Sequence, residues 1–208
     1  DRLAVDAITD NNRDIWVMPS KGGAAVQVTR DEGHDMAPSW SPDSRRLAFY
    51  GSRGTGQNAE LFVVDADGGI PKQITHSGGL GKWHPQWSPN GRWIAFIKGT
   101  RLHRVPASGG AEEQLTTAPT GYYRWSADGS RIYFRRIAAE DGSGGDDLWV
   151  FTLADGKERR VTRFSGRPGS LEPYGLAVGK THLYFTWSSD LGDIWVMDVA
   201  TNTGGGQD

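Results

Sequence analysis

The chain of 208 residues has no cysteine, only three methionines and no large excess of charge of either sign. Without cysteine, neither a disulfide framework nor a thiolate metal site can form. No apolar run approaches the roughly 18 residues that a membrane-spanning helix needs, so we expect no membrane insertion. The 23 basic and 25 acidic residues give a formal net charge of −2. A nucleic-acid partner, which requires a positively charged surface, is therefore not expected.

Glycine and the large aromatic residues are abundant instead. The sequence contains 29 glycines, 10 prolines and nine tryptophans. This composition is typical of many short strands joined by tight turns, and it disfavours long helices. We therefore expect an all-β protein.

One short pattern recurs five times: "DIWVM" from residue 14, "ELFVV" from 60, "RLHRV" from 101, "DLWVF" from 147 and "DIWVM" from 193. Successive copies begin 46, 41, 46 and 46 residues apart. Each of the first four is followed by a turn and a short segment that ends in Thr, as in "PSKGGAAVQVT". An apolar segment precedes every copy. Before three of these segments stands a similar turn, in "SWSPDSRRLAFY", "QWSPNGRWIAFI" and "RWSADGSRIYFR". One period therefore predicts four antiparallel strands, A to D.

Units of this length and content are typical of β-propellers, in which four-stranded blades bury their faces against one another. We expect a single propeller domain with five recognisable blades, approximately 1–30, 31–76, 77–117, 118–163 and 164–203, and a tail at 204–208. The first blade lacks strand A and the last lacks strand D. The chain then forms either an imperfect five-bladed ring or part of a ring of six or more blades. Open strand edges of this kind favour self-association.

Three tryptophans, Trp40, Trp87 and Trp125, each stand just before one of the Ser-Pro-Asp-like turns. Their regular spacing and size indicate apolar wedges between neighbouring blades. We expect them to be structural, with a ligand-stacking role as the alternative.

The phrases "DIWVM…GG…QVT" and "PSWSPDSRRLAF" resemble the TolB-type propeller repeat, over residues 2 to about 203. This repeat also occurs in tricorn-like proteases, in the propellers of prolyl oligopeptidase relatives, and as a sensor or accessory domain fused to kinases and amidohydrolases. Because the repeat is a scaffold for many activities, the resemblance is specific for the fold and much less so for function.

The resemblance to TolB implies a periplasmic or extracellular location and a role in protein–protein contact. We therefore expect a non-catalytic scaffold that binds a protein or peptide. The alternative is the propeller part of an enzyme, either a metal-dependent carbohydrate lyase or the substrate-gating domain of a prolyl oligopeptidase-like hydrolase. No GxSxG elbow occurs in the sequence, so we expect no catalytic residue in this chain.

The polar connections from strand D to strand A and from B to C all emerge at one end of the blades, the loop-rich face, where function is expected. Strand A is innermost, so its first residues are predicted to ring the mouth of a central channel. Alignment on Trp40, Trp87, Trp125 and Leu176 places Ala37, His84, Tyr122 and Pro173 in equivalent positions. The candidate ligand- or partner-binding residues are His34, Asp35, Trp83, His84, Tyr122, Arg124, Glu172 and Tyr174.

A metal site has weaker support. His34 and His84 are the only histidine pair that the alignment brings to one region, where Asp35 or Glu172 could complete a divalent-ion site. This resembles the histidine-held metal of some oligogalacturonate lyases, but no full signature is present. We therefore expect neither a metal nor another cofactor.

Overall fold

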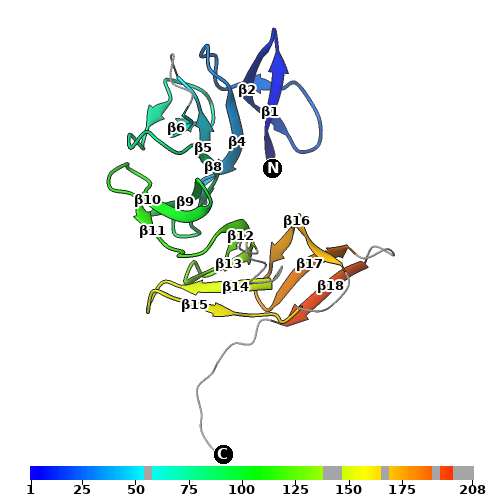
Figure 1. The fold of residues 1–208 in the computed structure, drawn as a ribbon. Coiled ribbons are helices and arrows are strands. Elements are labelled where there is room, and N and C mark those ends of the chain that lie inside the picture. Colours follow the sequence, from blue (N-terminus) through cyan, green and yellow to red (C-terminus); the bar gives the residue numbers. More distant parts are fainter. Residues whose placement is uncertain (54–57, 138–146, 165–168, 189–192, 199–208) are drawn as a thin grey trace, which may run out of the picture. The chain divides into compact units, whose positions relative to one another are not determined.

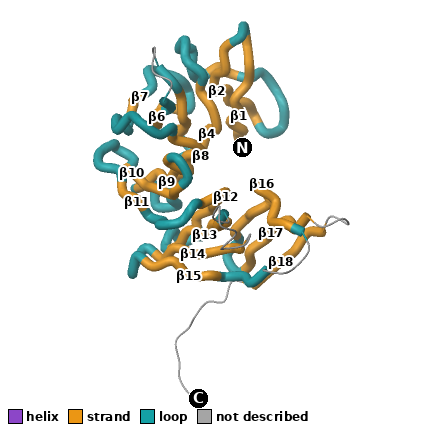
Figure 2. Tube along the Cα trace, in the orientation of Figure 1, coloured by secondary structure: helices purple, strands orange, loops and turns teal. Residues whose placement is uncertain are grey.

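The computed structural model describes residues 1–53, 58–137, 147–164, 169–188 and 193–198. Eighteen strands account for its regular structure, and the described residues contain no helix (Figure 2). The prediction of an all-β propeller is confirmed. No segment of the described residues qualifies as a membrane-spanning helix.

The chain divides into two compact units, Asp1–Thr117 and Ala118–Asp208. In the first unit, one sheet consists of β1 (Arg2–Thr9), β2 (Asn12–Pro19) and β3 (Val26–Gln27). The next contains β4 (Asp35–Trp40), β5 (Arg46–Gly51), β6 (Glu60–Asp65) and β7 (Lys72–Gln73). The third contains β8 (Lys82–Trp87), β9 (Trp93–Lys98), β10 (Arg101–Pro106) and β11 (Glu113–Gln114).

In the second unit, β12 (Thr120–Trp125), β13 (Arg131–Arg136), β14 (Asp147–Thr152) and β15 (Lys157–Arg160) form one sheet. The other consists of β16 (Ser170–Val178), β17 (His182–Ser188) and β18 (Asp193–Asp198). Each sheet is an antiparallel meander and falls within one of the expected blade segments (Figure 1). Within the described residues, the first and last sheets have three strands each.

Alternating side chains of one strand join the blades of the first unit. Leu47 and Phe49 of β5 pack with Ile15 of the first blade, whereas Ala48 and Tyr50 pack with Phe96 of the third. Period-two alternation thus gives each middle strand two apolar faces. Trp40 packs against the first of these clusters, and Trp87, 6 % exposed, belongs to the second. The wedge interpretation of these two residues is confirmed.

The recurrent turns are closed by a serine side chain. In the first turn, Ser41 Oγ donates to Asp43 Oδ1 and accepts the Arg46 N–H at 2.9 Å. The same arrangement occurs with Ser88 and Asn90 and with Ser126 and Asp128. These bonds satisfy backbone and side-chain groups locally, which explains why the turn recurs with so little change.

The alignment of the last blade was wrong by two residues. In the backbone ladders, Trp40 pairs with Leu47 and Trp87 pairs with Ile94. The equivalent partner in the last blade is Leu183, and it pairs with Val178. Val178, and not Leu176, therefore takes the wedge position. The cause is a shorter turn between β16 and β17, closed by the bond from Gly179 N–H to the His182 carbonyl.

A threonine after each outer strand forms a second recurrent contact, which we call the threonine clasp. The hydroxyl oxygens of Thr29, Thr75, Thr116 and Thr162 accept the backbone N–H of Ile15, Leu61, Leu102 and Leu148 at 2.8–3.0 Å. Three of these hydroxyls also donate to the carboxylate of the residue just before the clasped one in the sequence, which is Asp14, Glu60 or Asp147. The clasp explains both the acidic residue and the final Thr of the sequence repeat.

The clasp predicts the effect of replacing Thr162, which is 5 % exposed. In Thr162→Val the Leu148 N–H and one Asp147 oxygen lose a buried partner, and we expect the free energy of unfolding to fall by about 1–3 kcal/mol. Thr162→Ser keeps the hydroxyl and serves as the control, with a smaller loss. Denaturant titration measures both. A Val variant as stable as the original chain would show that the clasp contributes nothing.

Candidate functional site

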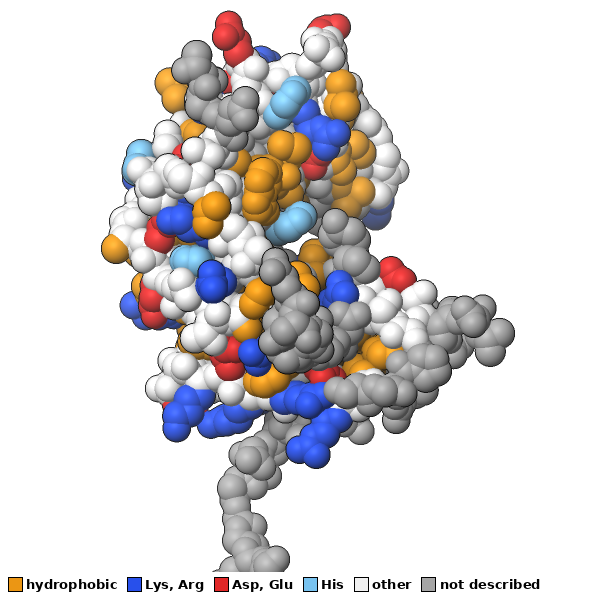
Figure 3. Space-filling model, in the orientation of Figure 1, with side chains coloured by type: hydrophobic (Ala, Val, Ile, Leu, Met, Phe, Trp, Pro, Cys, Tyr) orange, Lys and Arg blue, Asp and Glu red, His pale blue; other side chains and the backbone are white. Residues whose placement is uncertain are grey.

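An aromatic cluster lies at the start of the inner strands in the first unit. It consists of Met36 (β4), Tyr50 (β5), Trp83 and His84 (both β8). The Tyr50 and Trp83 rings meet edge to face, with centroids 5.1 Å apart, and the His84 ring lies 6.4 Å from Tyr50. The Tyr50 hydroxyl donates to Met36 Sδ at 3.6 Å. Figure 3 shows hydrophobic side chains gathered over β4, β5 and β8, with histidine side chains beside them.

A β-bulge re-aims each of the two inner strands at this point. Pairing shifts between Met36 and Ser39 in β4 and between Trp83 and Gln86 in β8. Within the bulges, Ala37 and His84 have φ of 52°, in the left-handed region that side chains other than glycine rarely adopt. Bulges and such backbone strain often accompany functional positions because they redirect a side chain.

Trp83 is the exposed member of the cluster, with 38 % of its surface accessible, whereas Tyr50 is 9 % exposed. The indole lies against the backbone of Gly81, where an added Cβ would be 2.5 Å from Trp83 Cζ2. Tyr50 and the Gly81 backbone therefore both position the exposed ring. A large apolar side chain held in this way presents a preformed contact surface.

Next to this cluster is a network of buried ion pairs. Lys82 is fully buried, and its Nζ lies 2.9 Å from Glu60 and 3.8 Å from Glu112. Glu112 also accepts a bond from Lys98 at 2.7 Å. Burial raises the pKa of Glu60, but hydrogen bonds from Thr75, Lys82 and the Gly78 N–H outweigh burial and bring the pKa below its ordinary value. The network links β6 of the second blade to β8 and β9 of the third.

The other predicted site residues of the first unit have different surroundings. Asp35 is fully buried, and Arg53 contacts both of its oxygens, at 2.5 and 3.0 Å. Burial raises the pKa of Asp35, while Arg53 opposes the shift. His34 is exposed, and its Nδ1 accepts the Arg13 N–H at 3.1 Å. Asp35 thus anchors the loop at the base of β4, and only His34 faces solvent.

The remaining predicted residues belong to the second unit. The Arg124 guanidinium lies 4.0 Å from the Tyr122 ring centroid and donates to the Tyr122 hydroxyl. Glu172 is exposed, and the side chain of Tyr174 lies outside the described residues. Among the residues that the structure describes, no three His, Asp or Glu side chains come together in a way that could hold a metal ion.

The roles of Tyr50 and of the partners of Lys82 could not be predicted from the sequence. Tyr50 ends an apolar strand and carries no signal apart from its place next to the bulge of the neighbouring strand. The partners of Lys82 are 22 and 30 residues away in the sequence. Only the pairing of the blades brings them together.

A family model described as the tricorn protease N-terminal beta propeller domain matches residues 8–203. The chain belongs to this family. The tricorn-type propeller chain is 37 % identical over 89 residues to "Uncharacterized peptidase YuxL" of Bacillus subtilis (strain 168), which covers 43 % of this chain and 13 % of the relative. It is 29 % identical over 130 residues to "Uncharacterized protein Atu1656" of Agrobacterium fabrum (strain C58 / ATCC 33970), covering 58 % of this chain and 42 % of the relative.

The crystal structure of TolB from Acinetobacter baumannii is also similar, with a TM-score of 0.72 and 17 % identity, covering 98 % of this chain and 51 % of TolB. At this identity the likeness concerns the fold. The chain thus spans about half of the TolB chain and less than half of each of the other two proteins. The predicted resemblance to TolB-type and tricorn-type propellers is confirmed.

The buried ion pairs predict a pH-dependent effect of Lys82→Met. The variant leaves the half-buried Glu60 carboxylate without its cation, so we expect the free energy of unfolding at neutral pH to fall by about 3–5 kcal/mol. In the original chain, the lowered pKa of Glu60 stabilises the fold above about pH 4, and this stabilisation is lost as the pH falls further. In the variant the hydrogen bonds from Thr75 and the Gly78 N–H remain, but burial is opposed less strongly, so the Glu60 pKa is higher than in the original chain. The difference in the free energy of unfolding between the original chain and Lys82→Met should therefore shrink as the pH falls from neutral toward about pH 4.

Urea titrations at several pH values measure this difference. Lys98→Met is the matched control, because Lys98 is 22 % exposed and its loss should cost less. A Lys82→Met effect below about 1 kcal/mol, or one independent of pH, would contradict the proposed role of the pair.

Proposed function

We propose that this chain is a non-catalytic propeller segment that binds an extended peptide segment of a protein partner through the aromatic cluster. The observation that supports this most directly is the exposed indole of Trp83, held between Tyr50 and the Gly81 backbone. Tryptophan is among the residues that contribute most to binding at protein contacts. Few other large apolar side chains of the inner strands are exposed to this extent.

The surroundings of Trp83 supply the other properties of a peptide site. His84 beside it provides ring nitrogens for polar contacts, and the exposed His34 lies on the loop that leads into β4. The ion pairs of Lys82 hold the strand that carries Trp83. Because these groups are already ordered, binding requires little additional loss of conformational entropy.

A second candidate function is the substrate-gating propeller of a larger peptidase. Membership of the tricorn propeller family and similarity to a relative named as a peptidase favour it. In this case the catalytic residues would lie outside the chain, and the aromatic cluster would contact peptide substrates. A metal-dependent carbohydrate lyase has no comparable support among the described residues.

The TolB-type resemblance also leads us to propose a periplasmic or extracellular location. Self-association through open strand edges stays a prediction, which sedimentation would test. Neither property is needed for peptide binding by the aromatic cluster.

Selection of extended peptides from a displayed library on the immobilised chain tests the proposed function. We expect Trp83→Ala to weaken the binding of the selected peptides by about 2 kcal/mol or more, which is roughly a 30-fold rise in Kd, because the variant removes the central contact. The melting temperature should change little, since the indole is partly exposed. Calorimetric titration and thermal unfolding of the same samples measure both quantities.

Trp93→Ala is the matched control. Trp93 is also partly exposed and belongs to the same blade, but it stacks with Arg104 outside the cluster, at 4.2 Å. Its loss should leave the affinity unchanged. Peptides that bind Trp83→Ala as well as the original chain, or a library that yields no binder, would refute the proposed site.

A further inference from the structure

Two blade junctions of the first unit contain the same pair of side chains. Arg2, the first residue of β1, lies over the ring of Trp40 at the end of β4, 5.0 Å from its centroid. Arg46, the first residue of β5, lies over Trp87 at the end of β8 at the same distance. An arginine that begins the second strand of one blade thus covers the wedge tryptophan of the next blade, in a cation–π contact.

The junction inside the second unit keeps the arginine but lacks the tryptophan. Arg131 begins β13, as Arg46 begins β5. Val178 ends β16 at the register of Trp40 and Trp87, because it pairs with Leu183 as they pair with Leu47 and Ile94. The isopropyl group of valine fills much less of the junction than an indole would.

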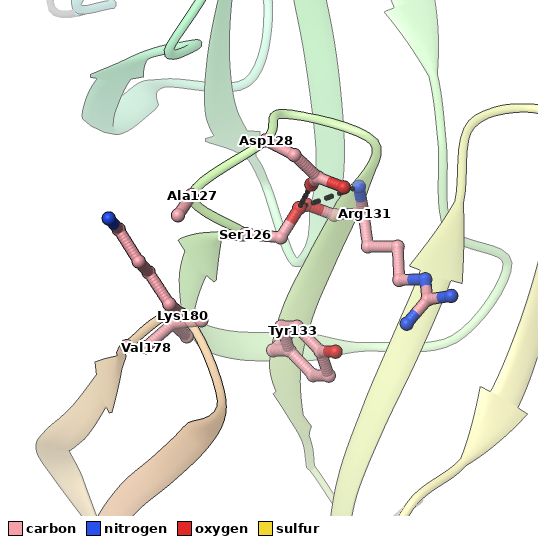
Figure 4. Close-up of a pocket in the computed structure, with 8 residues that line it drawn as sticks. Ser126, Ala127, Asp128, Arg131, Tyr133, Val178 and Lys180 are labelled. Carbon is pink, nitrogen blue, oxygen red and sulfur yellow. Dashed lines mark hydrogen bonds between the residues drawn. The ribbon is translucent and has the colours of Figure 1, made fainter. Parts of the chain in front are cut away.

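A cavity of about 400 Å³ lies at this junction, which we call the junction pocket. Its lining includes the turn from Ser126 to Asp128, Arg131, Tyr133 and the segment from Val178 to Lys180. Figure 4 shows Tyr133 below the turn, with Lys180 on one side and Arg131 on the other. The volume falls within the range of small-molecule sites, about 300–1,000 Å³.

The pocket combines an aromatic wall with two cationic side chains and one carboxylate. Tyr133 is 3 % exposed and occupies the position of Ala48 and Ala95 in the other blades, so one face of the space is aromatic. Neither Arg131 nor Lys180 forms an ion pair with any residue that the structure describes. The one carboxylate of the lining, Asp128, accepts bonds from Ser126 and Ser130 within its own turn.

We propose that the junction pocket binds a small planar aromatic carboxylate. The ring would lie in the junction pocket, against Val178 and Tyr133 and beside the Arg131 side chain. The carboxylate would pair with Lys180. This site is independent of the aromatic cluster, since it belongs to the other unit and to the turns at the opposite end of the strands.

Indole-3-acetate, titrated into the full chain and followed by saturation-transfer NMR and calorimetry, is the direct probe. Indole lacks the carboxylate and tryptamine carries the opposite charge, so we expect indole to bind about tenfold more weakly and tryptamine to show no saturable binding. Equal binding of the three compounds, or no saturable binding of indole-3-acetate, would overturn the proposal.

Two variants locate the site. Val178→Trp places an indole in the pocket beside Tyr133, and we expect it to abolish binding; thermal unfolding of the same sample checks that the variant folds. Arg131→Gln leaves the cavity intact and should weaken the binding of indole-3-acetate about tenfold. This variant tests the site even if Val178→Trp folds poorly. Arg46→Gln, at the occupied junction, is the matched control and should not change the affinity. Binding that survives both Val178→Trp and Arg131→Gln would place the ligand elsewhere.

Discussion

The threonine clasp is the contact on which the blades depend. The outer strands β3, β7 and β11 have only two residues each, too few to hold a sheet edge by backbone bonds alone. The hydroxyls of Thr29, Thr75 and Thr116 add a bond to the neighbouring strand just beyond these short segments. In the first two of these blades the hydroxyl also satisfies a carboxylate in the interior, where an unpaired charge would be costly. The clasp thus closes these blades at their outer edge.

Both proposed sites occur where the chain departs from this repeat. The aromatic cluster arises at the bulge that β4 and β8 share, where Trp83 and His84 replace Met36 and Ala37 of the preceding blade. The junction pocket arises where Val178 replaces the wedge tryptophan beside a retained Arg131. Positions that follow the repeat are occupied by packing and hydrogen bonds. Departures from it leave side chains and space available for binding.

The sequence was sufficient to predict the blades, the turns and the wedge role of Trp40 and Trp87, because these features recur at regular spacing and depend on local chemistry. It was not sufficient for Asp35, which was expected at a binding surface and lies buried against Arg53. An ion pair across a loop leaves no periodic signal. The last blade was misaligned because its shorter turn shifts the register by two residues. A shift of two residues preserves the alternation of apolar side chains, so the sequence pattern did not show that Val178 takes the wedge position. Trp83 was predicted as a binding residue and lies partly exposed in the structure, whereas Tyr50, which orients it, was not predicted.

Hydrogen exchange of individual amides tests the central claim that the clasps hold the blades together. The N–H groups of Ile15, Leu61, Leu102 and Leu148 donate to the clasp hydroxyls, each beside an outer strand of only two to four residues. If the clasps hold the blades together, all four amides exchange as slowly as the ladder-bonded amides of β5, β9 and β13, through opening of whole blades. Exchange of the four amides as fast as that of the exposed turns, while the amides of β5, β9 and β13 stay protected, would contradict this claim.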